Sequence, residues 1–363
     1  MKIIISGGGT GGHVFPAIAI ANAIKAIEPN ADILFVGANG KIEMEKVPKA
    51  GFPIKGLWIS GFHRQLTLRN LMFPLKLIAS LFKARRIVKA FKPDVAVGVG
   101  GYASGPTLEM AARAGVPALI QEQNSYAGVT NKLLAKKVKK VCVAYNNMDR
   151  FFEKEKIILT GNPVREAITQ IEGKKTEALE YFSFHDKKHT ILVIGGSLGA
   201  RTLNNAMEAN FDNIANRQDV QYLWQCGKLY YEEFKEGKTA QLPNVVLTKF
   251  VDKMDLAYAV ADVVISRAGA TSISELCLVQ KPVILVPSPN VAEDHQTKNA
   301  MALVAKSAAI LVKDSDAKDN MVTTALAVLG DHAHQLQLSQ NIKTLGRRNA
   351  AERIAKEVLK LVK

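Results

Sequence analysis

Short apolar runs alternate with polar, glycine-containing or helical segments along the chain. Runs typical of buried strands occupy residues 3–5, 32–36, 94–99, 118–121, 140–144 and 156–160. A chain that alternates strand and helix in this way favours parallel sheets covered by helices. The pattern weakens in a charged stretch at 173–188 and restarts with an apolar run at 190–194. We therefore expect an α/β protein with two domains.

Each predicted domain contains a glycine loop between a strand and a helix. The loops read Gly7-Gly8-Gly9-Thr10-Gly11-Gly12-His13 and Gly195-Gly196-Ser197-Leu198-Gly199-Ala200. This arrangement directs backbone N–H groups and a helix dipole toward an anion. The first loop is neither a Walker A loop nor a clean dinucleotide fingerprint, so a tight turn without a ligand is the alternative. Pro16 is expected in the first turn of the following helix.

An internal repeat relates the two halves of the chain. Asp94 precedes a strand, a glycine turn, a helix and a strand that begins after a proline, and Asp262 precedes the same series at nearly equal spacing. We predict two Rossmann-like domains whose parallel sheets face a central cleft, where ligands of such folds bind.

The expected boundaries follow from where the pattern weakens and restarts. The first domain is expected to cover 1–163 and the second 164–340. Residues 341–363 carry an apolar stripe with few helix breakers and are expected to form a helix that packs back on the first domain.

Positive charge is concentrated in the first half. The chain has 48 Lys and Arg against 33 Asp and Glu, a formal net charge of +15. Between residues 46 and 93 there is no acidic residue, and a second basic cluster lies at 132–140. Such a field is typical of proteins that bind a polyanion, either a nucleic acid or an anionic membrane.

An amphipathic segment inside the basic run favours the membrane. Its apolar members at helical spacing and its basic flanks are Leu71, Leu75, Ile78, Phe82, Lys76, Lys83, Arg85 and Arg86. Such a surface would lie on anionic lipid, although a core-facing helix with a solvated basic face is the alternative. Nucleic acid is disfavoured because no nucleic-acid module or aromatic platform is present.

Several classes of protein are disfavoured by what the sequence lacks. The apolar run at the N-terminus is too short for a secretory signal, and no apolar segment is long enough to span a bilayer. The three cysteines, Cys142, Cys226 and Cys277, form no CxxC pair and are expected to be core thiols in a reducing compartment. Asp314-Ser315-Asp316 matches the residue pattern of a metal-binding DxD motif. We nevertheless interpret it as a solvated loop and expect no metal.

The chain resembles the MurG family of glycosyltransferases. The matching segments, in the family's order, are residues 8–16, 100–106, 122–124 with 127–128, 161–165, 195–200, 267–270 with 274–275, and 294–296 with 299–300. The resemblance implies a GT-B fold with an N-terminal acceptor domain and a C-terminal donor domain. It also implies inverting transfer of N-acetylglucosamine from UDP-N-acetylglucosamine to undecaprenyl-diphosphate-linked muramyl-pentapeptide (lipid I to lipid II), without metal or cofactor.

The same resemblance implies a location and further partners. Family members work peripherally on the cytoplasmic face of the bacterial plasma membrane, in peptidoglycan synthesis. Other proteins of cell-wall synthesis and cell division are candidate partners.

The residues expected to bind the donor lie mostly in the second domain. A carboxylate such as Glu275 suits both hydroxyls of a ribose, although complementing a helix dipole is the alternative. Backbone N–H groups at the start of its helix would hold the diphosphate, and the residues concerned are Ala270, Thr271, Ser272, Ile273 and Ser274. Ser197 is expected to play a similar part from the other glycine loop. Arg165 is expected to neutralise phosphate charge as UDP leaves, with a hinge salt bridge as the alternative.

Three further positions are assigned by the resemblance. The backbone of Val251 is expected to read uracil, and Gln296 to contact the sugar hydroxyls. Asn124 is expected near the sugar and the acceptor. A solvent-facing loop amide is the alternative for Gln296 and Asn124, and the role of His295 stays open.

The acceptor hydroxyl needs a general base when it attacks the anomeric carbon. Two residues are candidates: His13, whose imidazole has a suitable ordinary pKa, and Glu122, a carboxylate after a strand. An alternative role for His13 is to bind the acceptor diphosphate, which Thr10, Gly11 and Gly12 are expected to contact.

Two other functions stay open at this stage. One keeps the fold and changes the chemistry to a UDP-sugar epimerase or a transferase that makes glycolipids from diacylglycerol. The other is a nucleotide-sensing scaffold on the membrane, which would bind UDP without transfer.

Overall fold

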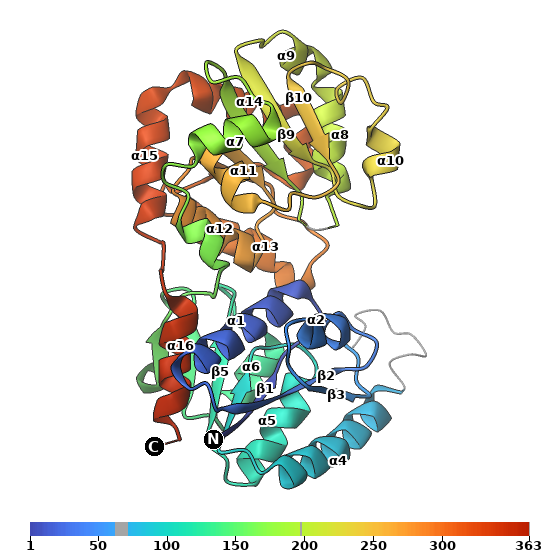
Figure 1. The fold of residues 1–363 in the computed structure, drawn as a ribbon, viewed down its shortest axis with the longest axis vertical. Helices are drawn as coiled ribbons and strands as arrows, with labels where there is room; N and C mark the ends of the chain where they lie inside the picture. The colour runs from blue at the N-terminus through green and yellow to red at the C-terminus, as the bar shows by residue number, and fades with distance from the viewer. Residues whose placement is uncertain (62–71, 197, 363) are drawn as a thin grey trace. The chain divides into compact units, whose positions relative to one another are not determined.

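The computed structural model describes residues 1–61, 72–196 and 198–362, and the chain divides into two compact units (Figure 1). Unit 1 consists of the described residues of Met1–Val164 and Asn349–Lys363. Unit 2 consists of the described residues of Arg165–Arg348. Each unit is built on one sheet in which every strand pairs in parallel with its neighbours, as the alternating pattern predicts.

Unit 1 has a seven-stranded sheet. In spatial order its strands are β3 (Ile54–Leu57), β2 (Asp32–Ala38), β1 (Lys2–Ser6), β4 (Val95–Gly98), β5 (Ala118–Glu122), β6 (Lys140–Val143) and β7 (Ile157–Leu159). Its helices are α1 (Gly11–Ile27), α2 (Glu43–Lys49), α4 (Phe73–Phe91), α5 (Ser104–Arg113), α6 (Val129–Leu134) and α16 (Ala350–Lys360), with a 3-10 turn η1 (Lys154–Lys156). Strand β3 was not expected, because Lys55 and Gly56 interrupt its short apolar run.

The core of unit 1 lies on both faces of its sheet. Side chains alternate along β1, so Ile4 packs in one apolar cluster with α4 and α5 while Ile3 and Ile5 pack in another with α1 and α16. All three isoleucines have no exposed surface. A strand buried on both faces explains why the sequence begins with an uninterrupted apolar run.

Unit 2 has a six-stranded sheet with the same order of connections. Its strands are β10 (Val245–Thr248), β9 (Val220–Gln225), β8 (His189–Ile194), β11 (Val263–Ser266), β12 (Val283–Leu285) and β13 (Ile310–Leu311). Its α-helices are α7 (Lys175–Phe182), α8 (Arg201–Ala209), α9 (Phe211–Ala215), α10 (Tyr231–Phe234), α11 (Met254–Val260), α12 (Ala270–Val279), α13 (His295–Val304), α14 (Ala317–Gly330) and α15 (His332–Lys343). Its 3-10 turns are η2 (Glu166–Thr169), η3 (Ala292–Asp294) and η4 (Asp314–Asp316).

The order of strands reverses at one point in each sheet. In unit 1 the reversal falls between β1 and β4, and in unit 2 it falls between β8 and β11. Loops that leave neighbouring strands in opposite directions at such a point leave a crevice at the carboxyl ends of the strands, where ligands of open α/β sheets bind.

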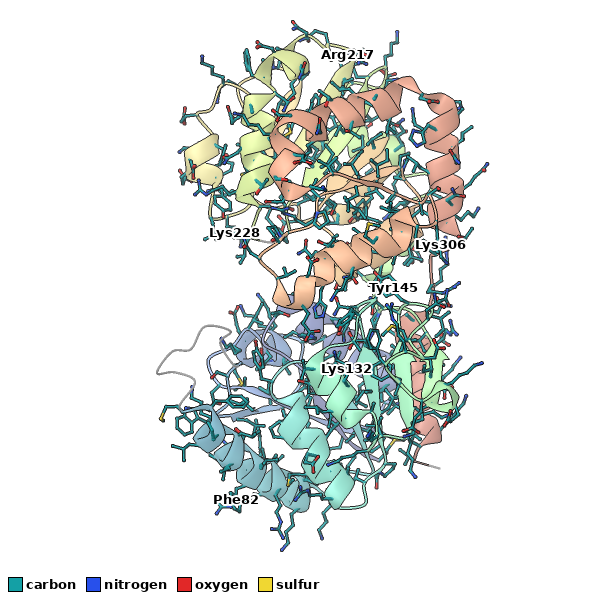
Figure 2. All side chains as sticks on the ribbon, turned by 180° about the vertical axis from the view of Figure 1, so that it is seen from behind. Phe82, Lys132, Tyr145, Arg217, Lys228 and Lys306 are labelled. Atoms are coloured by element: carbon teal, nitrogen blue, oxygen red, sulfur yellow. The ribbon has the colours of Figure 1, made fainter. Side chains whose placement is uncertain are left out.

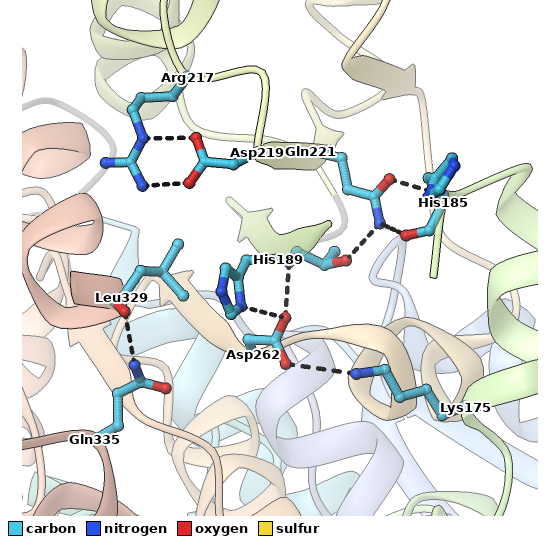
Figure 3. A network of polar contacts seen from close by, with 10 residues as sticks. Lys175, His185, His189, Arg217, Asp219, Gln221, Asp262, Leu329 and Gln335 are labelled. Carbon is cyan, nitrogen blue, oxygen red and sulfur yellow. Dashed lines mark hydrogen bonds and ion pairs between the residues drawn. The ribbon is translucent and has the colours of Figure 1, made fainter. Parts of the chain in front are cut away.

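The internal repeat corresponds to a hydrogen bond at the amino ends of the strands, opposite the carboxyl ends where ligands of such folds bind. Asp94 Oδ2 accepts a hydrogen bond of 2.7 Å from the backbone N–H of Lys2, and Asp262 Oδ2 accepts one of 2.8 Å from that of Thr190. In each unit, an aspartate before the fourth strand thus holds the start of the first strand. Asp262 also lies 3.7 Å from His189 Nδ1 and 3.8 Å from Lys175 Nζ (Figure 3).

The structure corrects the expected place of Pro16. Thr10 has an extended backbone, and its carbonyl accepts from the N–H groups of His13 and Val14 at 3.1 Å, so α1 begins at Gly11. Pro16 therefore lies in the second turn, not the first. Since proline has no N–H, it leaves the Gly12 carbonyl without the usual helical donor.

The C-terminal tail was expected to form one helix from residue 341, but it consists of the end of one helix and a second, separate helix. Helix α15 ends at Lys343, and α16 begins only at Ala350. Between them Gly346 lies against the Cys277 carbonyl, which a Cβ atom would approach to 2.8 Å, and Asn349 has a left-handed backbone. Helix α16 packs on α1 in unit 1, where Ile354 and Val358 have no exposed surface.

Replacing Asp262 tests its role in holding β8 to β11. Asp262→Ala is expected to lower the free energy of unfolding of unit 2 by about 1–2 kcal/mol, because the Thr190 N–H loses a charged acceptor. Denaturant unfolding measures the loss, and amide hydrogen exchange across β8 and β11 locates it. The control, Asp186→Ala, changes an exposed carboxylate before β8 and should cost less than about 0.5 kcal/mol. Equal losses in the two variants would contradict the proposed role.

Candidate active site

The first glycine loop crosses the loop that follows β4, with the two backbones in close contact. The N–H of Gly8 donates to the Gly100 carbonyl at 3.3 Å, and a Cβ atom on Gly101 would lie 2.1 Å from the Gly8 carbonyl oxygen. Gly9, Gly100 and Gly101 all have positive φ angles. Only glycine therefore fits where these two loops cross, and the crossing fixes the path of the chain into α1.

His13 lies on the first turn of α1, above this crossing. Its Nδ1 is 3.2 Å from Thr10 Oγ1, and its Nε2 would be 2.9 Å from a Cβ atom on Gly100. Thr10 and Gly12 are exposed, while Gly11 and His13 are half-buried. The structure thus brings these four predicted residues together at a helix start, whose first N–H groups have no partner within the helix.

Glu122 ends β5 and is almost fully buried. Its Oε1 accepts from the backbone N–H and the side chain of Asn124, at 3.0 and 3.3 Å. Its Oε2 accepts from the Gly128 N–H at 3.0 Å and from Asn131 Nδ2 at 2.8 Å. The carboxylate therefore holds the loop between β5 and α6, and with it the half-buried Asn124.

A buried network of amides beneath this loop has no role in the sequence-based assignment. Gln121 Nε2 donates to Asn162 Oδ1 at 2.7 Å, and Asn162 Nδ2 donates to the Gln123 carbonyl at 2.9 Å. Gln123 Nε2 in turn donates to the Val99 carbonyl at 2.8 Å and to Gln121 Oε1. A glutamine pair at the end of an apolar strand is a signal for such a network, but it does not identify the partners.

In unit 2 the corresponding glycine loop follows β8. A Cβ atom on Gly199 would lie 1.9 Å from the Cys226 carbonyl oxygen, so this loop also crosses its neighbour too closely for any side chain. Gly196 and Gly199 have positive φ angles. Ser197, the predicted phosphate contact of this loop, lies outside the described residues.

Gln225, at the end of β9, connects this loop to the segment of Val251. Its Nε2 donates to the Gly196 carbonyl at 2.8 Å, and its Oε1 accepts from the Val251 N–H at 3.2 Å. Val251 itself is buried. Sequence reasoning missed Gln225, although a buried glutamine near the end of an apolar strand, as Gln121 is in β5, is the same signal.

Glu275 lies in the second turn of α12 and carries a buried carboxylate. Arg165 Nε donates to its Oε1 at 3.1 Å, and Arg165 Nη2 donates to Oε1 and Oε2 at 3.0 and 3.2 Å. The hydroxyl of Tyr258, a fully buried residue of α11, donates to Oε2 at 3.3 Å. Burial raises the pKa of Glu275 above its ordinary value, and the Arg165 guanidinium opposes the shift.

The residues before Glu275 form the start of α12. Ala270, Thr271, Ser272 and Ser274 are half-buried, whereas the Ile273 side chain belongs to the core and its backbone N–H donates to the Gly269 carbonyl at 2.9 Å. The Ser274 hydroxyl donates to the Ala270 carbonyl at 2.9 Å. Tyr258 is a further residue that sequence reasoning missed, since nothing in the spacing of α11 points to α12.

Gln296 faces the loop after β11. Its Oε1 accepts from the backbone N–H groups of Ala268 and Ser288, at 3.2 and 2.9 Å. The oxygen is thus engaged by the backbone, which fixes the side chain. Its neighbour His295 lies with Nε2 3.5 Å from the Glu293 carboxylate.

Asp314 is not part of a solvated loop, contrary to expectation. It forms an ion pair with Arg267, and Thr202 Oγ1 donates to its Oδ2 at 3.1 Å. Arg267 also donates to the Val286 carbonyl at 2.9 Å. The aspartate therefore holds the arginine that begins the loop before α12. Within the described part of the chain, no cluster of His, Cys, Asp and Glu has the makings of a metal site.

The amphipathic segment forms α4, and its apolar residues lie on the outside. Leu75, Ile78 and Phe82 are 57%, 52% and 63% exposed, and Phe82 projects outward from α4 in Figure 2. Trp58, 49% exposed, extends this face, and Lys76 lies 5.8 Å from its ring. Lys83, Arg85 and Arg86 are exposed beside it, whereas Leu71 lies outside the described residues.

The other face of α4 packs on the sheet through Ala84, Ile87 and Val88. The exposed apolar row is therefore additional to the core-facing one. No helix in the described ranges is both long and apolar enough to cross a membrane. The three cysteines are buried, and burial raises the pKa of Cys142 to about 12.

Comparison with known proteins identifies the family of this chain. Residues 3–143 match the glycosyltransferase family 28 N-terminal domain, and residues 190–357 match the family's C-terminal domain. The UDP-N-acetylglucosamine--N-acetylmuramyl-(pentapeptide) pyrophosphoryl-undecaprenol N-acetylglucosamine transferase of Bacteroides fragilis is 55% identical, over 99% of this chain and 96% of the relative.

Solved structures extend the comparison. The crystal structure of Acinetobacter baumannii MurG is 28% identical, with a TM-score of 0.81 over 99% of both chains. A UDP-N-acetylglucosamine 2-epimerase is 15% identical, with a TM-score of 0.65 over 99% of this chain and 96% of its own. At this identity the likeness shows only that the two proteins share a fold. The predicted fold class, with two parallel-sheet α/β domains of the GT-B type, is confirmed. The chain is a glycosyltransferase and belongs to the MurG family.

Proposed function

We propose that this chain transfers N-acetylglucosamine from UDP-N-acetylglucosamine to undecaprenyl-diphosphate-linked muramyl-pentapeptide, with inversion at the anomeric carbon. The printed activity of the relatives supports this proposal, since they match the chain over nearly its full length. In this proposal, unit 1 binds the acceptor and unit 2 binds the donor. The chemistry of each switch point supports that division.

The Glu275 site is the observation that carries the donor half. Its carboxylate offers two oxygens next to the helix start of α12, which suits the vicinal hydroxyls of a ribose. The N–H groups of residues 270–272, which have no partner within the helix, suit the diphosphate, and the Val251 backbone suits the uracil edge. The amide nitrogen of Gln296 suits a sugar hydroxyl.

Arg165 changes partner in this proposal. Its side chain is 52% exposed, whereas the carboxylate that it contacts is 6% exposed. Ribose hydroxyls that bind Glu275 compete with the guanidinium for the same oxygens. Arg165 then turns to the diphosphate, where its charge compensates the negative charge that develops as UDP leaves.

His13 is the proposed general base. Its Nδ1 lies 3.2 Å from Thr10 Oγ1, and its Nε2 is the atom proposed to take the proton of the acceptor hydroxyl. The hydroxyl oxygen bonds to the anomeric carbon, the bond to the UDP oxygen breaks, and UDP leaves with the electron pair. Glu122 is the weaker candidate because both of its oxygens already accept hydrogen bonds from the loop that it holds.

The outer face of α4 is the proposed membrane contact. Exposed apolar side chains between basic ones insert at the boundary between headgroups and acyl chains of an anionic bilayer. We place the protein peripherally on the cytoplasmic face of the plasma membrane, where nucleotide sugars and lipid-linked acceptors are both accessible. Other proteins of cell-wall synthesis and division are proposed partners.

A transfer assay tests the proposed function as a whole. The lipid-linked muramyl-pentapeptide is incubated with a panel of labelled UDP-sugars, and label is expected in the lipid only with UDP-N-acetylglucosamine. A rearranged sugar formed without acceptor would indicate an epimerase instead. UDP binding without any transfer would indicate a nucleotide-sensing scaffold.

The donor half is tested at Glu275. Glu275→Ala is expected to weaken UDP binding by about tenfold or more, because two ribose hydroxyls lose a charged acceptor. Tyr258→Phe should weaken it by less, since it removes one hydrogen bond to the carboxylate. Isothermal titration calorimetry measures both, with Glu232→Ala, an exposed carboxylate of unit 2, as the control. An unchanged affinity in Glu275→Ala would refute the ribose assignment.

The base assignment is tested by comparing His13 with Glu122. His13→Ala is expected to lower kcat by about 10²–10⁴-fold and to remove the fall in rate at acid pH that protonation of the imidazole causes. UDP affinity should stay unchanged. Glu122→Gln should keep the acid limb of the pH profile and lower the melting temperature instead. If the acid limb survives in His13→Ala and disappears in Glu122→Gln, the two roles are reversed.

The membrane contact is tested on α4. Leu75→Glu combined with Phe82→Glu is expected to reduce co-sedimentation with anionic phospholipid vesicles by about tenfold, because two inserting side chains become charged. Leu336→Glu, at a residue of α15 that is 48% exposed, is the matched control. Unchanged sedimentation with an intact fold would mean that this face does not bind lipid.

A further inference from the structure

Glu43 is a charged residue with no exposed surface, and it lies outside the motifs discussed above. It occupies the first position of α2. Its Oε2 accepts from the Gly9 N–H at 2.9 Å, and its Oε1 accepts from the Ala38 N–H at 2.9 Å. One carboxylate therefore joins the end of β2 to the middle of the first glycine loop.

Two glycines leave the room that this side chain occupies. A Cβ atom on Gly8 would lie 2.2 Å from Glu43 Oε1, and a Cβ atom on Gly37 would lie 2.5 Å from Glu43 Cγ. Neither glycine has a positive φ angle, so their backbone conformation does not require glycine. It is the volume of the Glu43 side chain that excludes a larger residue at both positions.

We propose that Glu43 is a positioning residue for the transfer reaction, because it sets the conformation of the glycine loop that carries His13. This inference rests on the proposed function. Glu43 does not touch a substrate. It acts through the Gly9 peptide, which it holds at a φ of +87° by a charge-assisted hydrogen bond.

The bond also decides which N–H groups of the loop can meet an anion. The Gly9 N–H points at Glu43 and is engaged inside the protein. The groups left at the start of α1 are those of Gly11 and Gly12, next to His13. The acceptor diphosphate is therefore bound at the helix start and not in the bend of the loop, which places its sugar close to the imidazole.

Replacing Glu43 should lower the rate of transfer to the acceptor and leave the affinity for the donor unchanged. Glu43→Gln keeps the size of the side chain but turns an NH₂ group toward one of the two N–H donors, which leaves that donor without an acceptor. We expect kcat/KM for the lipid-linked acceptor to fall by about tenfold or more, and the affinity for UDP, bound in unit 2, to stay within about twofold. Glu45→Gln, an exposed neighbour on α2, is the control and should change neither quantity.

Coupling to Gly8 separates this role from a loss of stability. Gly8→Ala alone is expected to lower acceptor kcat/KM by about tenfold, because the new methyl group meets the carboxylate. In the Glu43→Ala background the same change should cost less than about threefold, since the carboxylate is gone. Additive effects in the double variant would overturn the proposal, as would equal losses of acceptor kcat/KM and UDP affinity in Glu43→Gln.

Amide exchange in the unmodified protein gives a test that needs no variant. The Gly9 N–H should exchange slowly, and the N–H groups of Gly11 and Gly12 should exchange fast. Fast exchange at Gly9 would overturn the proposal. If the unmodified chain transfers N-acetylglucosamine and Glu43→Gln does so equally well, only the role of Glu43 fails. If the unmodified chain transfers nothing, the proposed function itself fails.

Discussion

Each unit contains a close crossing of two backbone loops at the carboxyl ends of its strands, between the loops after β1 and β4 in unit 1 and between the loops after β8 and β9 in unit 2. In unit 1 the Gly101 Cα lies against the Gly8 carbonyl, and in unit 2 the Gly199 Cα lies against the Cys226 carbonyl. A Cβ atom would collide at either crossing, so only glycine allows the two loops to approach this closely. Each glycine loop then leads into a helix at an angle that the crossing fixes. The start of α1, which should meet a substrate, takes its place from the crossing in unit 1, and the crossing in unit 2 leads into α8.

Buried polar side chains hold these crossings, and most of them come from distant parts of the chain. Glu43 holds Gly9, Gln123 holds the Val99 carbonyl, and Gln225 holds Gly196 and Val251. Each satisfies a backbone group that would otherwise be buried without a partner, which is costly in a low-dielectric interior. These contacts restrain the loops at Gly9, Val99 and Gly196 outside regular secondary structure, and restraint of this kind is what a preorganised site requires.

The sequence predicts the sheets better than it predicts these supports. Strand β1 is evident from three isoleucines, and the aspartates before β4 and β11 reveal the repeated topology. The family resemblance adds Glu275 and Arg165, which the fold brings into contact although 110 positions separate them. Glu43 and Tyr258 escape prediction because their meaning depends on partners 34 and 17 positions away, and neither local spacing nor residue type specifies such contacts. The roles of His13, Glu122 and the donor-site residues stay predictions, since no ligand contact tests them.

The supports also explain why two loops that look alike in sequence are not equivalent in chemistry. The loop of unit 2 rests on a neutral amide, Gln225, which would add no charge next to the proposed diphosphate. The loop of unit 1 rests on the carboxylate of Glu43, whose negative charge in a buried place repels a phosphate at Gly9. In the proposed function, the anion near this loop therefore binds further along, at the start of α1 beside His13. A buried acid that repels phosphate from the bend and leaves the helix start available suits a loop that positions an acceptor for attack, and it argues against a second nucleotide site.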